Sequence, residues 1–157
     1  MDYSIRDIKK EEISELDRFL YLAIYVHKGE TPPPYKIIYK PELQVYVKNL
    51  GKEKDDHILV AEANNKIVGA TWVRIMDDYG HIDDETPSLI ISVEEEYRGK
   101  GIGKSLLSSM ISLLTTKGYK SLSLSCQKEN YACDIYRSFG FYVVYDIDDE
   151  YIMRKDL

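Results

Sequence analysis

The sequence predicts an α+β protein in which a mixed sheet of about seven strands is flanked by about four helices. Two observations predict this fold class. Apolar residues recur at helical spacing in some segments and alternate with polar residues in others. The predicted strands occur both as hairpins and as pairs separated by a helix, which gives a sheet antiparallel and parallel neighbours. A chain of 157 residues can bury one hydrophobic core, so we expect a single domain over residues 1–157.

The first 56 residues predict one strand and two helices. Residues 2–9 alternate weakly and are typical of a strand. Residues 11–27 place apolar side chains on one helix face, and the glycine and prolines of HKGETPPPY (27–35) end that helix. Pro41 favours the start of a second, short helix that reaches about residue 50.

The middle of the chain changes to the period of strands. Residues 57–76 predict two strands that turn at Asn64-Asn65, a hairpin signal. The run SLIISV (88–93) is apolar enough for a strand buried on both faces. A helix then begins near Ile102, and Gly118 closes it.

The last quarter of the chain predicts three strands and one helix. Residues 121–126 alternate as a strand. Asn130 is a good N-cap for a helix that reaches Phe139. Residues 141–147 and 151–155 then complete the predicted sheet.

Composition and charge narrow the class of protein. Hydrophobic residues make up 44% and charged residues 31%, as in globular proteins. The net charge of −6 argues against a general nucleic-acid binder and mildly favours a cationic partner. The start is charged from Asp2 on, and the longest apolar run (19–26) is far shorter than the roughly 20 residues of a membrane span. Two cysteines give no disulfide framework. We expect a cytoplasmic protein that binds neither nucleic acid nor membrane.

The stretch EEEYRGKGIGKSLL (94–107) lies between a predicted strand and a predicted helix. That arrangement points unpaired backbone N–H groups and the positive end of the helix at an anion. Glycines let the backbone approach the anion, while Arg98, Lys100 and Lys104 add positive charge. The loop therefore predicts a phosphate site, although a plain strand-to-helix turn is a common alternative. Neither the dinucleotide spacing G-x-G-x-x-G nor the P-loop spacing fits these residues.

The spacing that fits is R-x-x-G-x-G, at residues 98–103, after an apolar strand that ends in Val93. It resembles the acetyl-coenzyme A binding motif of the GCN5-related N-acetyltransferase (GNAT) superfamily. NYACDIYRSFGF (130–141) is similar to the second motif of that family, N-x-A-x-x-[LI]-Y-x-x-x-G-F. The resemblance covers residues 57–157, whereas residues 1–56 match only in their strand-helix-helix pattern. It implies a GNAT-like fold with a mostly antiparallel sheet that is splayed in the middle.

The resemblance also implies acetyl-coenzyme A (acetyl-CoA) as the acetyl donor and places its contacts. Backbone groups of Ile91 and Val93 would pair with the pantetheine arm where the sheet splays, and an amide of this strand would support the thioester oxygen. Asn130 would contact the arm, and Tyr136 would stand near the sulfur. Backbone amides of the glycine loop would hold the pyrophosphate: Arg98, Gly99, Lys100, Gly101, Ile102, Gly103 and Lys104.

The three glutamates at residues 94–96 are a departure from the family, which often has proline where Glu95 stands. They set negative charge beside an anion site. Because backbone amides would provide most of the binding, we expect these carboxylates to point to solvent.

Acetyl transfer to an amine needs a neutral amine, a fixed donor for the oxyanion and a proton for the leaving thiolate. Tyr136 stands at the acid position of the family, and its alternative role is that of a packed helix residue. For the base, Glu85 is the first choice and His81 the second. A solvated acidic loop that only attracts a cationic acceptor is the alternative for both.

Other polar residues have simpler roles. Asn130 can serve as a helix cap, Cys126 as a small apolar residue and Trp72 as a core residue. The histidines at 27, 57 and 81 lack metal-ligand spacing, so we expect no metal site.

The sequence thus predicts an acyltransferase that moves an acetyl group from acetyl-CoA to a primary amine by direct attack in a ternary complex. A small-molecule acceptor is preferred. A peptide or protein N-terminus or lysine is the alternative acceptor, and a non-catalytic CoA-binding sensor is the alternative class. A homodimer is compatible with such a fold.

Overall fold

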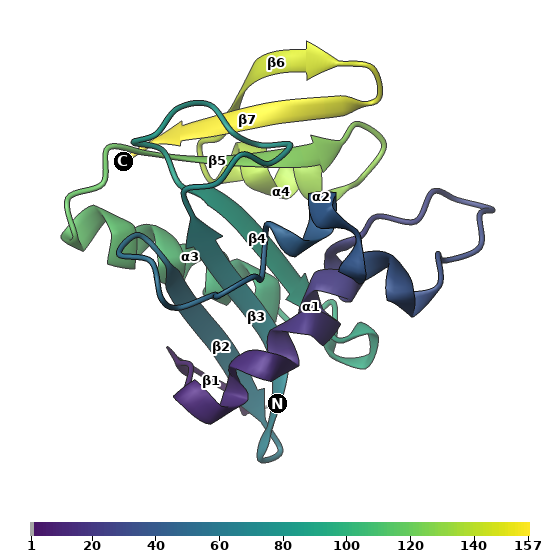
Figure 1. Cartoon of the computed structure of the whole chain (residues 1–157), viewed down its shortest axis with the longest axis vertical. Helices are drawn as coiled ribbons and strands as arrows, with labels where there is room; N and C mark the ends of the chain where they lie inside the picture. The colour runs from purple at the N-terminus through teal and green to yellow at the C-terminus, as the bar shows by residue number, and fades with distance from the viewer. Residues whose placement is uncertain (1) are drawn as a thin grey trace.

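The computed structural model describes residues 2–157, which form a seven-stranded sheet with helices on both faces (Figure 1). The strands are β1 (Ser4–Asp7), β2 (His57–Ala63), β3 (Lys66–Arg74), β4 (Ser88–Val93), β5 (Ser121–Gln127), β6 (Tyr142–Ile147) and β7 (Glu150–Asp156). The helices are α1 (Leu16–Ala23), α2 (Pro41–Gln44), α3 (Ile102–Thr116) and α4 (Ala132–Ser138), with short 3-10 helices at Lys10–Glu15, Tyr35–Tyr39 and Glu95–Tyr97. Within residues 2–157, no helix has the length and apolar character of a membrane span.

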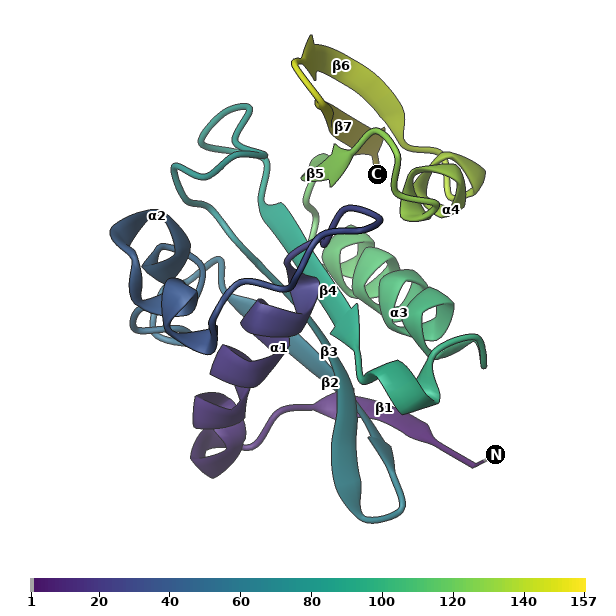
Figure 2. The ribbon, with the colours of Figure 1, turned by 90° about the vertical axis from the view of Figure 1, so that its right-hand side faces the viewer.

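The strands are ordered β1-β2-β3-β4-β5-β7-β6, and every neighbouring pair is antiparallel except β4 and β5, which are parallel. The predicted mixed, mostly antiparallel sheet is therefore confirmed. Between β4 and β5 the register joins Ser88 to Ser123 and extends no further. Figure 2 shows β5 and the β6–β7 hairpin turning away from β4 beyond that point, so the predicted splay in the middle of the sheet is also confirmed.

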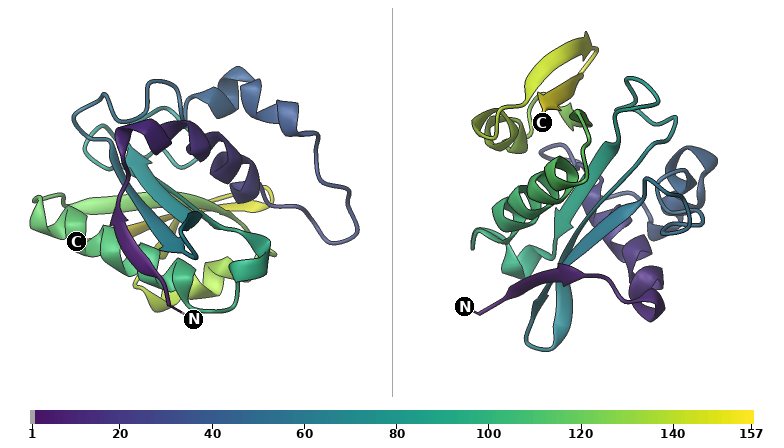
Figure 3. Two further views of the ribbon diagram at one scale, coloured as in Figure 1. Left: turned by 90° about the horizontal axis from the view of Figure 1, so that it is seen from below. Right: turned by 90° about the vertical axis from the view of Figure 1, so that its left-hand side faces the viewer.

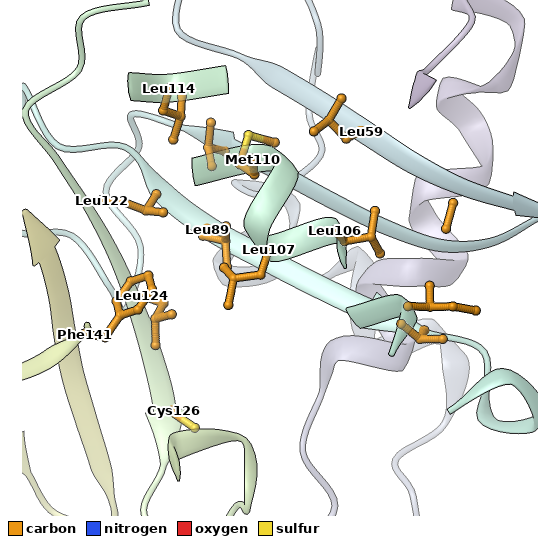
Figure 4. Packing of buried hydrophobic residues seen from close by; sticks show 14 of the residues in the cluster. Leu59, Leu89, Leu106, Leu107, Met110, Leu114, Leu122, Leu124, Cys126 and Phe141 are labelled. Atoms are coloured by element: carbon orange, nitrogen blue, oxygen red, sulfur yellow. The ribbon is translucent and has the colours of Figure 1, made fainter. Parts of the chain in front are cut away.

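Two hydrophobic clusters hold the helices on opposite faces of the sheet, as the two views of Figure 3 show. On one face, α3 presents Leu106, Leu107, Met110 and Leu114 to the sheet, and Figure 4 shows these side chains against Leu89 and Leu122. On the other face, the cluster under α1 contains Trp72, which is fully buried and donates its indole N–H to the Tyr46 carbonyl at 2.9 Å. Trp72 is thus a core residue, as expected.

The N-terminal helices are shorter than the periodicity predicts. The helix expected over 11–27 is a 3-10 turn followed by α1, and it ends at Ala23 because Ile24 takes extended backbone angles. The helix expected from Pro41 to about residue 50 ends at Gln44. The Arg74 guanidinium binds the carbonyls of Val45 and Lys48 at 3.1 and 2.9 Å, so these oxygens serve a tertiary contact rather than a helix.

Candidate active site

The glycine loop joins β4 to α3 and exposes a continuous run of backbone N–H groups. Gly99 and Gly101 adopt φ of 75° and 86°, a region that favours glycine, and a Cβ at either position would meet no atom within 4 Å. Within residues 2–157, the N–H groups from Gly99 to Lys104 donate to no backbone carbonyl, whereas Ser105 begins the helical pattern by donating to Gly101 at 3.0 Å. The loop thus offers open space above unpaired donors at a helix N-terminus, which fits a phosphate group.

Arg98 and Glu94, two charged residues next to this loop, have hydrogen-bond or ion-pair partners in the protein. The Arg98 N–H donates to the Glu95 carbonyl at 3.2 Å, and its Nε donates to the Val93 carbonyl at 2.9 Å. The unpaired amides therefore begin one residue after Arg98. Glu95 and the residue after it are exposed, as expected. The expectation is wrong for Glu94, which is half-buried because it forms an ion pair with Arg18 of α1.

Among the described residues, the edge of β4 that faces β5 has no strand partner beyond Ser88. The Glu94 N–H donates to the Val68 carbonyl on β3 at 2.8 Å. Because backbone groups of successive strand residues point to opposite edges, those of Ile91 and Val93 point away from β3 and into the gap. The two residues named from the motif resemblance thus present their backbone groups where the sheet is open, although the Val93 carbonyl already accepts from Arg98 Nε.

Helix α4 lies against β5 and carries Tyr136 on the same side of the sheet as α3, while Asn130 lies in the turn just before it. Asn130 caps the first turn, since its Oδ1 accepts from the Ala132 N–H at 2.9 Å, which confirms the capping role. The Tyr136 ring packs edge-on against Phe141, with 5.8 Å between ring centroids. Burial raises the pKa of the Tyr136 hydroxyl, so this group stays protonated at neutral pH.

The two cysteines meet at the junction of β5 and α4. The Sγ atoms of Cys126 and Cys133 are 2.7 Å apart, and both side chains are buried as free thiols. Burial is the main cause that raises the pKa of Cys126, and contact with Cys133 adds to it. Cys126 is therefore a small buried residue, as expected, but it lies beside the helix that carries Tyr136.

The two candidate bases lie in the loop between β3 and β4. Glu85 is exposed, and within residues 2–157 its carboxylate makes no hydrogen bond or ion pair. The His81 Nδ1 is buried without a hydrogen-bond partner there, and its Nε2 is 3.7 Å from Asp84 Oδ1. A Cβ on Gly80 would approach the backbone of Leu124 and Ser125 at 3.2 Å, so this loop packs on β5. No described contact joins Glu85 to Tyr136.

Sequence reasoning did not find the contacts that hold the segment after α1 in place. His27 Nδ1 lies 2.5 Å from Glu129 Oε1, and its Nε2 lies 3.9 Å from Asp149 Oδ2. These contacts fasten the 24–34 segment to the turns after β5 and β6. Partners 102 residues apart in sequence leave no local signal, so no pattern in the chain could have shown them.

A surface hollow of about 510 Å³ adjoins the glycine loop, with Lys104, Ser105 and Phe139 among its lining residues. A second hollow, of about 430 Å³, lies far along α3 and is lined by residues that include His57 and Tyr119. The first of the two lies over β1 and α3, and it meets the glycine loop only at Lys104.

Comparison with known proteins gives the family. Residues 20–141 match the acetyltransferase (GNAT) family, and the chain belongs to it. An uncharacterised N-acetyltransferase of Methanocaldococcus jannaschii is 29% identical over 147 residues, which cover 88% of this chain and 60% of that relative. A putative [ribosomal protein bS18]-alanine N-acetyltransferase of Bacillus subtilis is 31% identical over 85 residues, which cover 54% of this chain and 52% of that relative. The chain thus spans 60% or less of the length of these two relatives.

A solved structure gives the same fold. The PaiA N-acetyltransferase of Thermoplasma acidophilum, in complex with coenzyme A, superimposes with a TM-score of 0.74 at 21% identity, and the match covers 100% of both chains. The fold and the family expected from the two motifs are therefore confirmed.

Proposed function

We propose that this protein transfers an acetyl group from acetyl-CoA to a primary amine. The observation that carries the proposal is that a run of unpaired backbone N–H groups and a strand edge without a partner strand adjoin each other. The N–H groups from Gly99 to Lys104 and the open edge of β4 at Ile91 and Val93 follow one another along the chain. Together they fit a long ligand with a pyrophosphate at one end and an amide-containing arm at the other.

In this proposal, the loop holds the pyrophosphate through Gly99, Lys100, Gly101, Ile102, Gly103 and Lys104, while Arg98 shapes the loop through its bond to Val93. Ile91 and Val93 pair with the pantetheine arm, and an amide of β4 stabilises negative charge on the thioester oxygen. Asn130 reaches the arm through its amide nitrogen, because its oxygen already caps α4.

Tyr136 is the proposed general acid. Its raised pKa keeps the proton on the hydroxyl until the thiolate leaves, and general acid help is worth roughly 10²–10⁴-fold in rate. We propose Glu85 and, second, His81 as the base or as groups that attract a cationic amine. Both lie in the loop between β3 and β4, which packs on β5.

A small-molecule amine is our preferred acceptor, and the amine is acetylated directly in a ternary complex. A peptide or protein N-terminus is a second acceptor class, favoured by the likeness to a putative ribosomal-protein-alanine acetyltransferase. A non-catalytic CoA sensor is the rival class of function, and Tyr136 argues against it because a sensor needs no acid.

The test is the release of coenzyme A from acetyl-CoA over polyamines, amino acids, aminoglycosides and alanine-led peptides, with wild type and Tyr136→Phe side by side. We expect turnover on one class, a loss well beyond tenfold in the variant and unchanged acetyl-CoA binding by calorimetry. Binding without turnover on any acceptor would favour the sensor. An absence of acetyl-CoA binding would refute the cofactor site.

A further inference from the structure

Two polar residues, Gln127 on β5 and Glu150 on β7, lie at the open end of the sheet, on the face opposite α4. Along β5, Leu122, Leu124 and Cys126 join the cluster under α3, so the alternate residue Gln127 points to the other face. Its register partner on β7 is Glu150, which points to that face as well. An acceptor that enters opposite the cofactor-binding helices meets this pair.

The pair stands level with the part of β4 that is open. The two parallel strands start in register at Ser88 and Ser123. Gln127 lies four residues beyond Ser123, and Ser92 lies four residues beyond Ser88. Gln127 and Glu150 therefore lie on the β5 side of the gap, about as many residues from its closed end as Ile91 and Val93 are on the β4 side, where the thioester is proposed to lie.

The contact within the pair fixes the carboxylate. Gln127 Nε2 donates to Glu150 Oε1 at 2.9 Å, so the amide nitrogen must face the carboxylate. The other amide atom, Gln127 Oε1, is buried and has no hydrogen-bond partner within residues 2–157. An unpaired buried carbonyl costs folding free energy, so the arrangement orients Glu150 rather than maximising stability.

The surroundings of Glu150 favour its binding a proton or a cation. Burial raises the pKa of its carboxyl group, the hydrogen bond from Gln127 opposes this shift in part, and the neighbouring Asp149 adds to it. Within residues 2–157 its Oε2 makes no hydrogen bond or ion pair, so one oxygen stays available. Glu85, in contrast, is exposed, and its carboxylate makes no hydrogen bond or ion pair in the part of the chain that the structure describes.

We propose that Glu150 binds the acceptor amine and takes its proton, and that Gln127 is a positioning residue that holds Glu150 toward the gap. This inference rests on the proposed acetyl transfer, and it names the base that Glu85 and His81 left open.

The proton balance of the step is complete. Glu150 accepts one proton from the amine nitrogen, which forms the new C–N bond to the acetyl carbon. Tyr136 gives its proton to the sulfur as the C–S bond breaks. An acceptor that enters as an ammonium loses two protons from its nitrogen. Glu150 takes one before the attack, and the other, lost once the C–N bond has formed, returns to the Tyr136 oxygen that gave its proton to sulfur. The net result is one amide, one thiol and one proton released to solvent from Glu150.

The test measures amine binding first, so that it does not depend on turnover. Calorimetry on the protein saturated with coenzyme A uses 1,4-diaminobutane, spermidine and an alanine-led peptide as probes. Glu150→Gln keeps the hydrogen bond from Gln127 but removes the charge. We expect it to weaken binding of the preferred probe at least tenfold and to lower kcat about 10²-fold, with unchanged acetyl-CoA affinity.

Two matched variants separate the charge from its surroundings. Asp148→Asn removes one negative charge from the β6–β7 turn at a φ of 52°, which asparagine tolerates, and it should bind the probes like wild type. Gln127→Ala should weaken binding less than Glu150→Gln, and the double variant should add no further loss, because Gln127 acts through Glu150.

Each result bears on the assignment. Equal binding by wild type and Glu150→Gln, or binding of none of the probes by wild type, overturns it. A larger loss in Glu85→Gln than in Glu150→Gln also overturns it. If the proposed transfer fails, acetyl-CoA releases no coenzyme A with any probe, yet the binding comparison still decides the role of Glu150.

Discussion

Ser88 on β4 and Ser123 on β5 are register partners with their hydroxyl oxygens 3.3 Å apart, and they mark the closed end of the gap in the sheet. Two residues before each of them along the chain, Thr86 Oγ1 and Ser121 Oγ make a buried hydrogen bond of 2.6 Å. Ser88 also donates to Asp78 Oδ1 at 2.8 Å. Buried hydroxyl pairs thus hold together the two strands that separate further along to form the proposed site.

The hydroxyl of Thr86 is predicted to contribute to stability at this closed end. Thr86→Val keeps the shape of the side chain but leaves the buried Ser121 hydroxyl without its partner, which should cost about 1–3 kcal/mol of unfolding free energy. Urea denaturation measures the loss. Thr86→Ser keeps the hydroxyl and is the control; if it loses as much stability as valine, the hydrogen bond is not the cause.

Gly101 of the glycine loop is predicted to be needed for acetyl-CoA binding, and Gly118 at the end of α3 provides a matched control. Gly101 and Gly118 have φ of 86° and 89°, and a Cβ on either would meet no atom within 4 Å. Alanine at each position should therefore cost a similar 1–2 kcal/mol or so through the left-handed backbone conformation. Only Gly101→Ala should also weaken acetyl-CoA binding, by about tenfold or more, which is 1.4 kcal/mol. Equal affinity of the two variants in calorimetry would contradict the phosphate role of the loop.

Cys126 is predicted to react slowly with alkylating agents in the folded protein. Burial raises the pKa of its thiol, and the thiolate is the reactive form. Mass spectrometry after iodoacetamide treatment at pH 8 should find Cys126 and Cys133 unmodified in buffer and modified in urea. Fast alkylation of the native protein would show that the β5–α4 junction opens readily.

Local sequence patterns predicted most of the sheet, because each strand shows alternating polar and apolar residues and each tight turn contains residues that favour turns. The Asn64-Asn65 turn is an example, since both residues take positive φ as a two-residue hairpin requires. Periodicity did not predict where the second helix ends, because a residue distant in sequence binds its backbone: Arg74 donates to the carbonyls of Val45 and Lys48. It also gave no sign of the bond between Gln127 and Glu150, because strand register decides which polar residues become neighbours.

The contact between His27 and Glu129 predicts a pH-dependent contribution to stability. The hydrogen bond that His27 donates to the Glu129 carboxylate is the main cause that raises the pKa of His27 above its usual 6.5. A histidine with a raised pKa in the folded state stabilises the protein fully below the unfolded pKa, and the contribution disappears as pH rises through the folded value. Wild type should therefore melt at a higher temperature than Glu129→Gln at pH 6, and this difference should shrink to little by pH 9.

The partner variant tests whether the effect belongs to this pair. His27→Gln should abolish the pH dependence of the difference, and the double variant should melt like the single ones, because both changes remove the same contact. Carboxylates also face His27 at Glu30 on its own segment and at Asp149 in the β6–β7 turn. If the melting difference between wild type and Glu129→Gln is the same at pH 6 and pH 9, the charged contact does not hold the 24–34 segment against the turn after β5.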